Sequence, residues 1–161
     1  MRFDAKSEER PALHVASLRH VGPYHEIGPT IERIVTWAVK KGLFRPPQTQ
    51  LLAVYYDDPE TTDVTRLRAD ACVTVPEGTS VDGEVKILAI PGGRFAVARV
   101  EIDGSEFGAA WQRLVNEWMP EHGVEPDISP GRLCYEIYLN DSDQHPEKLH
   151  IVELCEPIRA H

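Results

Sequence analysis

One carboxylate lies in a stretch of sequence where a charge is expensive. Glu136 has apolar and aromatic neighbours throughout the segment 133–139 (LCYEIYL), which predicts a strand that is covered on both faces. Alternation along a strand places Glu136 on the same face as Cys134 and Tyr138. A buried carboxylate must be paired, hydrogen-bonded or used to hold a ligand. Two interpretations stay open: a structural acid satisfied by a neighbouring donor, or an acid that faces a pocket for a cationic or polarised ligand.

Three aromatic residues are candidates to share a site with Glu136. Tyr138 is on its strand, Tyr55 matches Tyr138 in an internal repeat, and Trp111 lies on the apolar face of a predicted helix. Aromatic rings beside a buried acid can hold organic cations through their quadrupoles, although aromatic residues at helical spacing more often belong to the core. We predict that Glu136, Tyr55, Tyr138 and Trp111 bind a ligand.

The chain contains none of the familiar enzyme motifs. It has no G-x-S-x-G elbow, no Walker loop and no G-x-G-x-x-G, and its seven histidines form no H-x-H or H-E-x-x-H pair. No metal site and no cofactor are therefore expected. Cys72, Cys134 and Cys155 are far apart in strand-like segments, which favours buried thiols over a disulfide or a metal site.

The charge balance restricts the partners. The 161 residues carry a formal net charge of −9 and show no basic stripe, which argues against direct binding to nucleic acid. An acidic surface suits a basic protein partner or a cationic ligand. No apolar run approaches the roughly 18 residues of a membrane span, and the N-terminus has no signal-peptide core. We expect a cytoplasmic protein that does not contact membranes.

The same order of elements occurs twice. The first half predicts a strand at 14–21, a helix from about 27 to 41 and strands at 50–56 and 66–75; the second half predicts a strand at 94–102, a helix from about 107 to 118 and strands at 132–139 and 149–155. Trp37 matches Trp118 at an offset of 81, and Tyr55 matches Tyr138 at 83. These offsets indicate a duplication, with half-units at about 11–76 and 91–158 and a linker at about 77–90.

The duplication bears on both the fold and the acid. Two such half-units are expected to form an α+β fold in which duplicated β-α-β-β units make a pseudo-twofold antiparallel sheet, with two helices on one face and a central cleft. At the offset of 83, the counterpart of Glu136 is Ala53. The repeated unit therefore does not require an acid at this position, which favours the ligand-binding interpretation.

Four segments resemble a known family. They are VGPY at 21–24, LAVYYDDPE at 52–60, LRAD with VTVP at 67–76, and YEIYLND at 135–141. Together they resemble the GyrI-like proteins, which are stand-alone DNA gyrase inhibitors related to the effector-binding domains of AraC- and MerR-type regulators. The resemblance implies one GyrI-like domain over residues 1–161, with a tandem SHS2-type fold and a central pocket. It also implies that Glu136 faces a bound ligand, commonly a lipophilic cation.

Three functions remain open after this comparison of motifs. The leading hypothesis is a small-molecule-binding protein that protects the cell by sequestering toxins or drugs, by inhibiting DNA gyrase, or by both. Some proteins of the family hydrolyse cyclopropane-type electrophilic toxins; Glu136 would then be a general base or would stabilise positive charge, with a pKa raised by burial. The third possibility is a stand-alone effector-binding domain of a transcription regulator. We expect a monomer whose ligands are lipophilic or cationic small molecules.

The last predicted strand departs from the family pattern. Acidic Glu153 stands where apolar residues are common in the family, and it bears on the charge of the expected pocket.

Overall fold

The computed structural model describes residues 1–160 and divides them into two units of α+β architecture. Unit 1 contains residues 1–11 and those from 91 onward, and unit 2 contains residues 12–90. Each unit has four antiparallel strands and one helical segment within the described range, besides short 3-10 turns. The α+β class predicted from the sequence is confirmed.

Unit 2 is built in the order β3-β4-β2-β5. Its elements are β2 (Leu13–Val21), the 3-10 turn η1 (Tyr24–Glu26), α1 (Gly28–Lys40), β3 (Leu51–Tyr55), the 3-10 turn η2 (Val64–Arg66), β4 (Arg68–Thr74) and β5 (Lys86–Ile90). The helix α1 buries Thr30, Ile34 and Ala38, the face that the spacing of apolar residues predicts. Pro29 lies in its first turn, where its missing N–H costs nothing.

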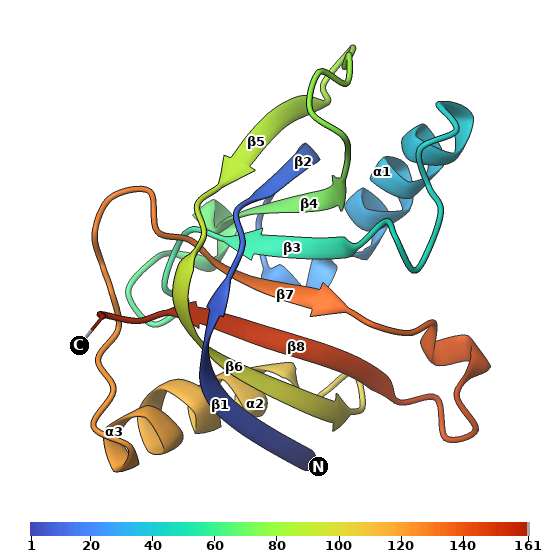
Figure 1. The fold of residues 1–161 in the computed structure, drawn as a ribbon. Coiled ribbons are helices and arrows are strands. Elements are labelled where there is room, and N and C mark those ends of the chain that lie inside the picture. The colour runs from blue at the N-terminus through green and yellow to red at the C-terminus, as the bar shows by residue number, and fades with distance from the viewer. Residues whose placement is uncertain (161) are drawn as a thin grey trace. The chain divides into compact units, whose positions relative to one another are not determined.

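Unit 1 is built in the order β7-β8-β6-β1, and its helical segment lies on one side of these strands in the lower part of Figure 1. Its elements are β1 (Arg2–Arg10), β6 (Gly93–Ile102), α2 (Phe107–Gln112), the π-helical segment η3 (Arg113–Trp118), α3 (Met119–Glu121), β7 (Cys134–Tyr138), the 3-10 turn η4 (Ser142–Gln144) and β8 (His150–Pro157). In the turn before α2, the Asp103 N–H donates to the Glu106 carboxylate at 3.0 Å, and the Asp103 carboxylate accepts from Ser105 N–H at 2.7 Å.

One face of unit 1 forms a hydrophobic core beneath the helix. Ala110, Leu114 and Met119 are fully buried there against residues of β6 and β8. In a regular α-helix, Trp118, four residues after Leu114, would take the buried position that Met119 occupies. The π-helical segment widens the turn, so that the buried residues are five apart from Leu114 to Met119. Trp118 packs at the margin of the core and stacks on His122 with ring centroids 4.2 Å apart.

The pairing register supports the duplication. In unit 2, Arg19 of β2 pairs with Asp70 of β4; in unit 1, Arg99 of β6 pairs with Glu153 of β8. A basic residue thus lies opposite an acidic one at the same place in both halves. Such opposite-charge pairs on neighbouring strands stabilise the sheet. Both helices also end alike: the N–H of Leu43 donates to the carbonyl of Ala38 at 2.9 Å, and the equivalent residues after α3 repeat this bond.

Replacing Gly42, which follows α1, tests this helix end. Gly42 has φ +71°, and a Cβ there would meet nothing within 4 Å, so the cost of Gly42→Ala is conformational. We expect a loss of about 1 kcal/mol in the free energy of unfolding, measured by urea denaturation. Gly28→Ala is the matched control, since Gly28 also has open space but no positive φ. An equal effect of both substitutions would contradict this explanation.

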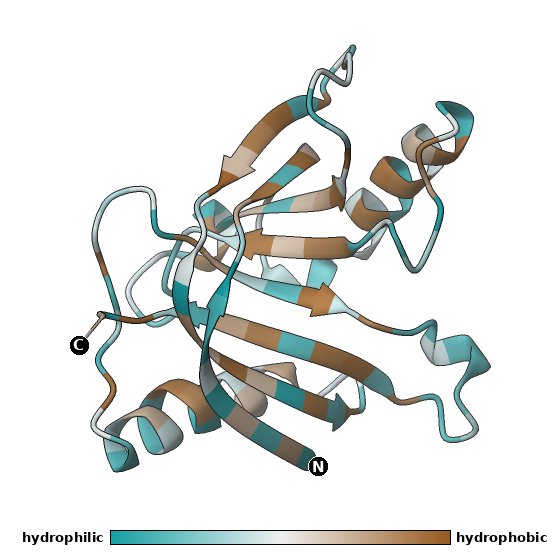
Figure 2. Cartoon of the chain, in the orientation of Figure 1, coloured by the Kyte–Doolittle hydropathy of each residue, from teal (hydrophilic) through white to brown (hydrophobic). Residues whose placement is uncertain are grey.

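The two edge strands were not predicted from the sequence. β1 precedes β2 in the chain but pairs with β6, and β5 precedes β6 but pairs with β2. Each half of the chain therefore gives its leading strand to the unit that the other half builds. β5 occupies the end of the segment predicted as a linker. Figure 2 shows why the sequence does not predict β1 as a strand. Hydrophilic residues separate its few hydrophobic ones, as expected of an edge strand.

Candidate functional site

Glu136 is the centre of a hydrogen-bonded group in unit 1. Its side chain belongs to β7 and the residue is only 2% exposed. Trp111 Nε1–H donates to its Oε1 at 2.6 Å, and the Tyr138 hydroxyl donates to its Oε2 at 2.8 Å. Three of the four predicted ligand residues are therefore in contact. Their role in binding stays a prediction.

The register of the strands explains this arrangement. Glu136 lies opposite Leu154 of β8, whose side chain belongs to the core beneath the helix. Glu136 therefore projects toward the helix, where α2 supplies Trp111 from its solvent-shielded side. Two donors on two carboxylate oxygens offset part of the cost of burying the acid. The group thus places a buried acid beside two aromatic side chains.

Removing one donor tests whether the group is intact in solution. Trp111→Phe deletes the N–H that Glu136 Oε1 accepts, and leaves a buried acceptor short of one partner. We expect the free energy of unfolding to fall by about 1–2 kcal/mol, measured by urea denaturation. Trp37→Phe is the matched control, because Trp37 Nε1–H donates to an exposed carboxylate, Asp82, at 2.9 Å. It should change stability by less than about 0.5 kcal/mol. Equal losses in both variants would contradict the assignment.

Tyr55, the fourth predicted residue, lies in unit 2. It is half-buried at the end of β3, and its ring packs on that of Tyr24 with centroids 4.6 Å apart. The Tyr24 hydroxyl donates to the carbonyl of Asp57 at 2.8 Å, which fixes this aromatic pair. Tyr24 was not among the predicted site residues, although it ends the VGPY segment that carried part of the family resemblance.

A second acid, Glu156, shares the helix-covered face with Glu136. Glu156 lies on β8 two residues beyond Leu154 and pairs with Ala96 of β6, another residue of this core. Burial raises the pKa of its carboxyl to about 7. Within the described residues Glu156 makes no hydrogen bond or ion pair. Glu156 was not predicted as a site residue; at the offset of 83 its counterpart is Val73, which is fully buried.

Comparison with known proteins identifies the family. The family model of the GyrI-like small molecule binding domain matches residues 5–159. The chain belongs to this family. It is 33% identical to DNA gyrase inhibitor 2 of Dickeya dadantii (strain 3937), over 98% of the chain and 96% of that protein. It is 34% identical to the DNA gyrase inhibitor of Edwardsiella piscicida, over 98% and 99%. Among solved structures, the EcmrR C-terminal domain matches with a TM-score of 0.74 and 17% identity, over 100% of both chains.

The departure at Glu153 does not add charge beside Glu136 in this GyrI-like chain. Glu153 projects from the face of β8 opposite to that of Leu154 and Glu136. There the Arg10 guanidinium donates to its carboxylate at 3.0 Å. This ion pair links β8 to the edge strand β1.

Unit 2 of the GyrI-like chain has its own buried acid, Asp70, which is 5% exposed. Arg19 Nε–H donates to one carboxylate oxygen at 2.7 Å and the Tyr56 hydroxyl to the other at 2.5 Å. The Arg19 guanidinium also lies over the Tyr56 ring, 4.9 Å from its centroid. Since a cation on the adjacent strand neutralises Asp70, this acid has a structural role.

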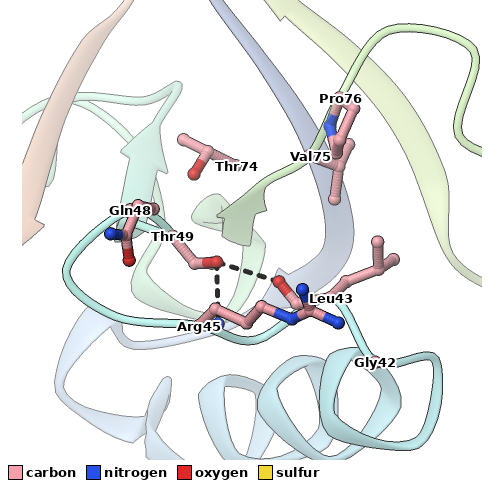
Figure 3. A pocket seen from close by; sticks show the side chains of 8 residues that line it. All are labelled: Gly42, Leu43, Arg45, Gln48, Thr49, Thr74, Val75 and Pro76. Carbon is pink, nitrogen blue, oxygen red and sulfur yellow. Dashed lines mark hydrogen bonds between the residues drawn. The ribbon is translucent and has the colours of Figure 1, made fainter.

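An open cavity of about 540 Å³ lies in unit 2, beside the loop that follows α1 (Figure 3). It is lined by Gly42, Leu43, Arg45, Gln48, Thr49, Thr74, Val75 and Pro76. The Thr49 hydroxyl donates to the carbonyl of Leu43 at 2.8 Å and accepts from the Arg45 N–H at 2.9 Å, as the dashed lines in Figure 3 show. No carboxylate and none of the predicted ligand residues lines this cavity, so it does not match the predicted site.

Residues 1–160 contain no group of three or more histidine, cysteine, aspartate or glutamate side chains arranged to hold a metal ion. In the same range, no helix has both the length and the apolar character that crossing a membrane requires.

Proposed function

We propose that this GyrI-like chain binds lipophilic organic cations at a site that includes Glu136, Trp111 and Tyr138, and protects the cell by sequestering such compounds. The observation that carries the proposal is a fully buried carboxylate, hydrogen-bonded to two aromatic side chains, at a position where the other repeat has Ala53. The family's description as a small molecule binding domain supports it. A ligand-binding role for Tyr55, which lies in unit 2, stays a prediction.

The energetics favour a ligand role for the acid. Burying a carboxylate costs stability even when it accepts two hydrogen bonds, and the equivalent position in unit 2 does without one. The fully buried Ala53 shows that the strand packs well with an apolar residue here. A cation bound against the aromatic rings would offset the electrostatic cost of burying the acid.

Inhibition of DNA gyrase is a second candidate function, and the named relatives at 33–34% identity over nearly the whole chain support it. The net charge of −9 makes contact with gyrase protein more favourable than contact with DNA. We propose that a monomer acts in the cytoplasm and does not bind duplex DNA itself. Hydrolysis of cyclopropane-type toxins by Glu136 is a further alternative without a specific structural observation behind it.

A thermal-shift experiment tests the primary proposal. The probes are tetraphenylphosphonium, a lipophilic cation, and triphenylphosphine oxide, a neutral compound of similar shape. We expect the cation to raise the melting temperature in proportion to the logarithm of its concentration, and the neutral compound to do so much less. Equal shifts with both probes, or none with the cation, would overturn the proposal.

Separate assays distinguish the alternatives. Mass spectrometry after incubation with a cyclopropane-bearing toxin would show ring-opened product over many turnovers if the chain is a hydrolase. Gyrase inhibition requires loss of supercoiling in a reaction with purified gyrase and relaxed plasmid, together with no shift of plain duplex DNA in a gel. A salt-sensitive shift of the DNA alone would contradict the protein-contact mechanism.

A further inference from the structure

Glu156 is the one carboxylate on the helix-covered face of unit 1 that the contacts among residues 1–160 leave without a partner. Glu136, on the same face, has a donor on each of its two oxygens. Glu156 is partly shielded from solvent, yet no donor within that range reaches it. A carboxylate in this state has both oxygens available to a molecule that enters from outside.

The strand register places the two acids side by side. Glu136 lies opposite Leu154, and Glu156 is the next residue of β8 on that face. Residues related in this diagonal way on neighbouring antiparallel strands have Cβ atoms about 7–8 Å apart or slightly less. Two glutamate side chains at that separation can contact one small ligand together. Continuing the same register puts Cys134 directly beside Glu156, so no basic residue of β7 intervenes.

The other repeat supplies an internal comparison. The offset of 83 that relates Glu136 to Ala53 relates Glu156 to Val73, and both counterparts are fully buried and apolar. Two acids have thus been placed on one face of unit 1 where the equivalent face of unit 2 has none. Neither acid is needed for the strands to pair, because β3 and β4 pair in the equivalent register.

The surroundings of Glu156 do not explain it as a structural acid. Its neighbour across β6 is Ala96, and the next residue in that direction, on β1, is Ser7. The nearest basic residue on this face of β6 is Arg94, which lies at the strand's end and reaches toward Glu9, 3.9 Å away. By contrast, Glu153 on the opposite face has its own arginine.

We propose that Glu156 is a second ligand-binding carboxylate of the Glu136 site and that it selects cations carrying N–H groups, that is, protonated amines, over quaternary cations. This inference rests on the proposed function. Glu136, whose oxygens are occupied, attracts any positive charge, whereas the oxygens of Glu156 can accept hydrogen bonds from an ammonium N–H. A quaternary nitrogen has no such donor and loses that contact.

A matched pair of probes tests the selectivity. The probes are dimethyl-(diphenylpropyl)ammonium, a protonated tertiary amine, and its trimethyl quaternary analogue with the same diphenyl skeleton. Binding is measured by calorimetry at pH 8, where the Glu156 carboxyl is mostly ionised. We expect Glu156→Gln to weaken the amine about tenfold, as one charge-assisted hydrogen bond warrants, and the quaternary analogue less than threefold.

Two further variants make the result decisive. Glu156→Val copies Val73 and should fold, as checked by circular dichroism, with the same loss of amine affinity. Glu153→Gln changes a carboxylate of the same strand on the opposite face and should leave both affinities unchanged. Equal losses for the two probes, or no loss for either, would overturn the selectivity assigned to Glu156. Failure of the unaltered protein to bind either probe would instead refute the proposed function, and this inference with it.

Discussion

Glu136→Gln should lower the affinity for tetraphenylphosphonium about 10- to 100-fold and leave the protein folded. The glutamine keeps the shape of the side chain, and its carbonyl oxygen still accepts from Trp111 Nε1–H. The Tyr138 hydroxyl can rotate to accept from the new amide. Only the negative charge is lost, and a charge-assisted contact is worth about 1.5–3 kcal/mol. Calorimetric titration gives the affinity and urea denaturation the stability.

The controls separate charge from shape. Affinity for triphenylphosphine oxide, which is neutral, should be the same in the variant and the unaltered protein. Glu136→Ala copies Ala53 of the other repeat and should also lose cation affinity, but it leaves the two donors of Trp111 and Tyr138 without their acceptor. The prediction fails if Glu136→Gln unfolds the protein or if cation affinity does not change.

Glu156→Val should stabilise the protein, and by more at high pH than at low pH. Burial raises the carboxyl pKa from its ordinary value of 4.5 to about 7, so the folded protein holds a proton that the unfolded chain has lost. The stability of the unaltered protein therefore falls as pH rises from about 4.5 through 7, and the valine variant lacks this loss. We expect the stability difference to widen by about 2–3 kcal/mol between pH 4.5 and pH 8.

The charged groups around Glu156 define the controls for this pH dependence. Glu136 faces it from β7, Arg94 with its partner Glu9 lies at the end of β6, and the thiol of Cys134 is beside it on β7. Glu147→Gln, in the exposed turn before β8, is the matched substitution of a solvent-exposed carboxylate. A flat difference for Glu156→Val would show that this carboxyl is not buried in solution.

The grouping of Glu136 with Tyr138 and Trp111 could be predicted because it depends on regular periods. Alternation in β7 places Tyr138 on the face of the acid, and helical spacing turns Trp111 inward. Glu156 was missed for the opposite reason. It follows Cys155 near the end of β8, where an isolated acid before Pro157 resembles the exposed end of a strand. Only the comparison with Val73 across the repeat marks the position as buried.

The fold shows the same division between what local sequence determines and what it does not. The helix ends at Gly42 and Gly123 follow from glycine chemistry that acts over a few residues. The π-helical segment Arg113–Trp118 contains no glycine or proline that would mark it; Pro120, which has no N–H to donate, follows two residues later in α3. The partners of β1 and β5 are equally hard to predict, because β1 is mostly polar and β5 is a run of only five residues, and neither strand pairs with its neighbour in the sequence.

The exchange of leading strands sets an order for the protein's biosynthesis. Unit 2 is continuous in the chain, so its four strands can assemble once residue 90 has left the ribosome. Strand β1 is made first, yet its partner β6 follows only about 80 residues later. At roughly 5–20 residues per second, β1 waits several seconds unpaired on the nascent chain. Its Arg2, Asp4, Lys6, Glu8, Glu9 and Arg10 keep the waiting strand soluble and disfavour pairing with a neighbouring chain. The charges that hide this strand from sequence prediction are thus what protects it during translation.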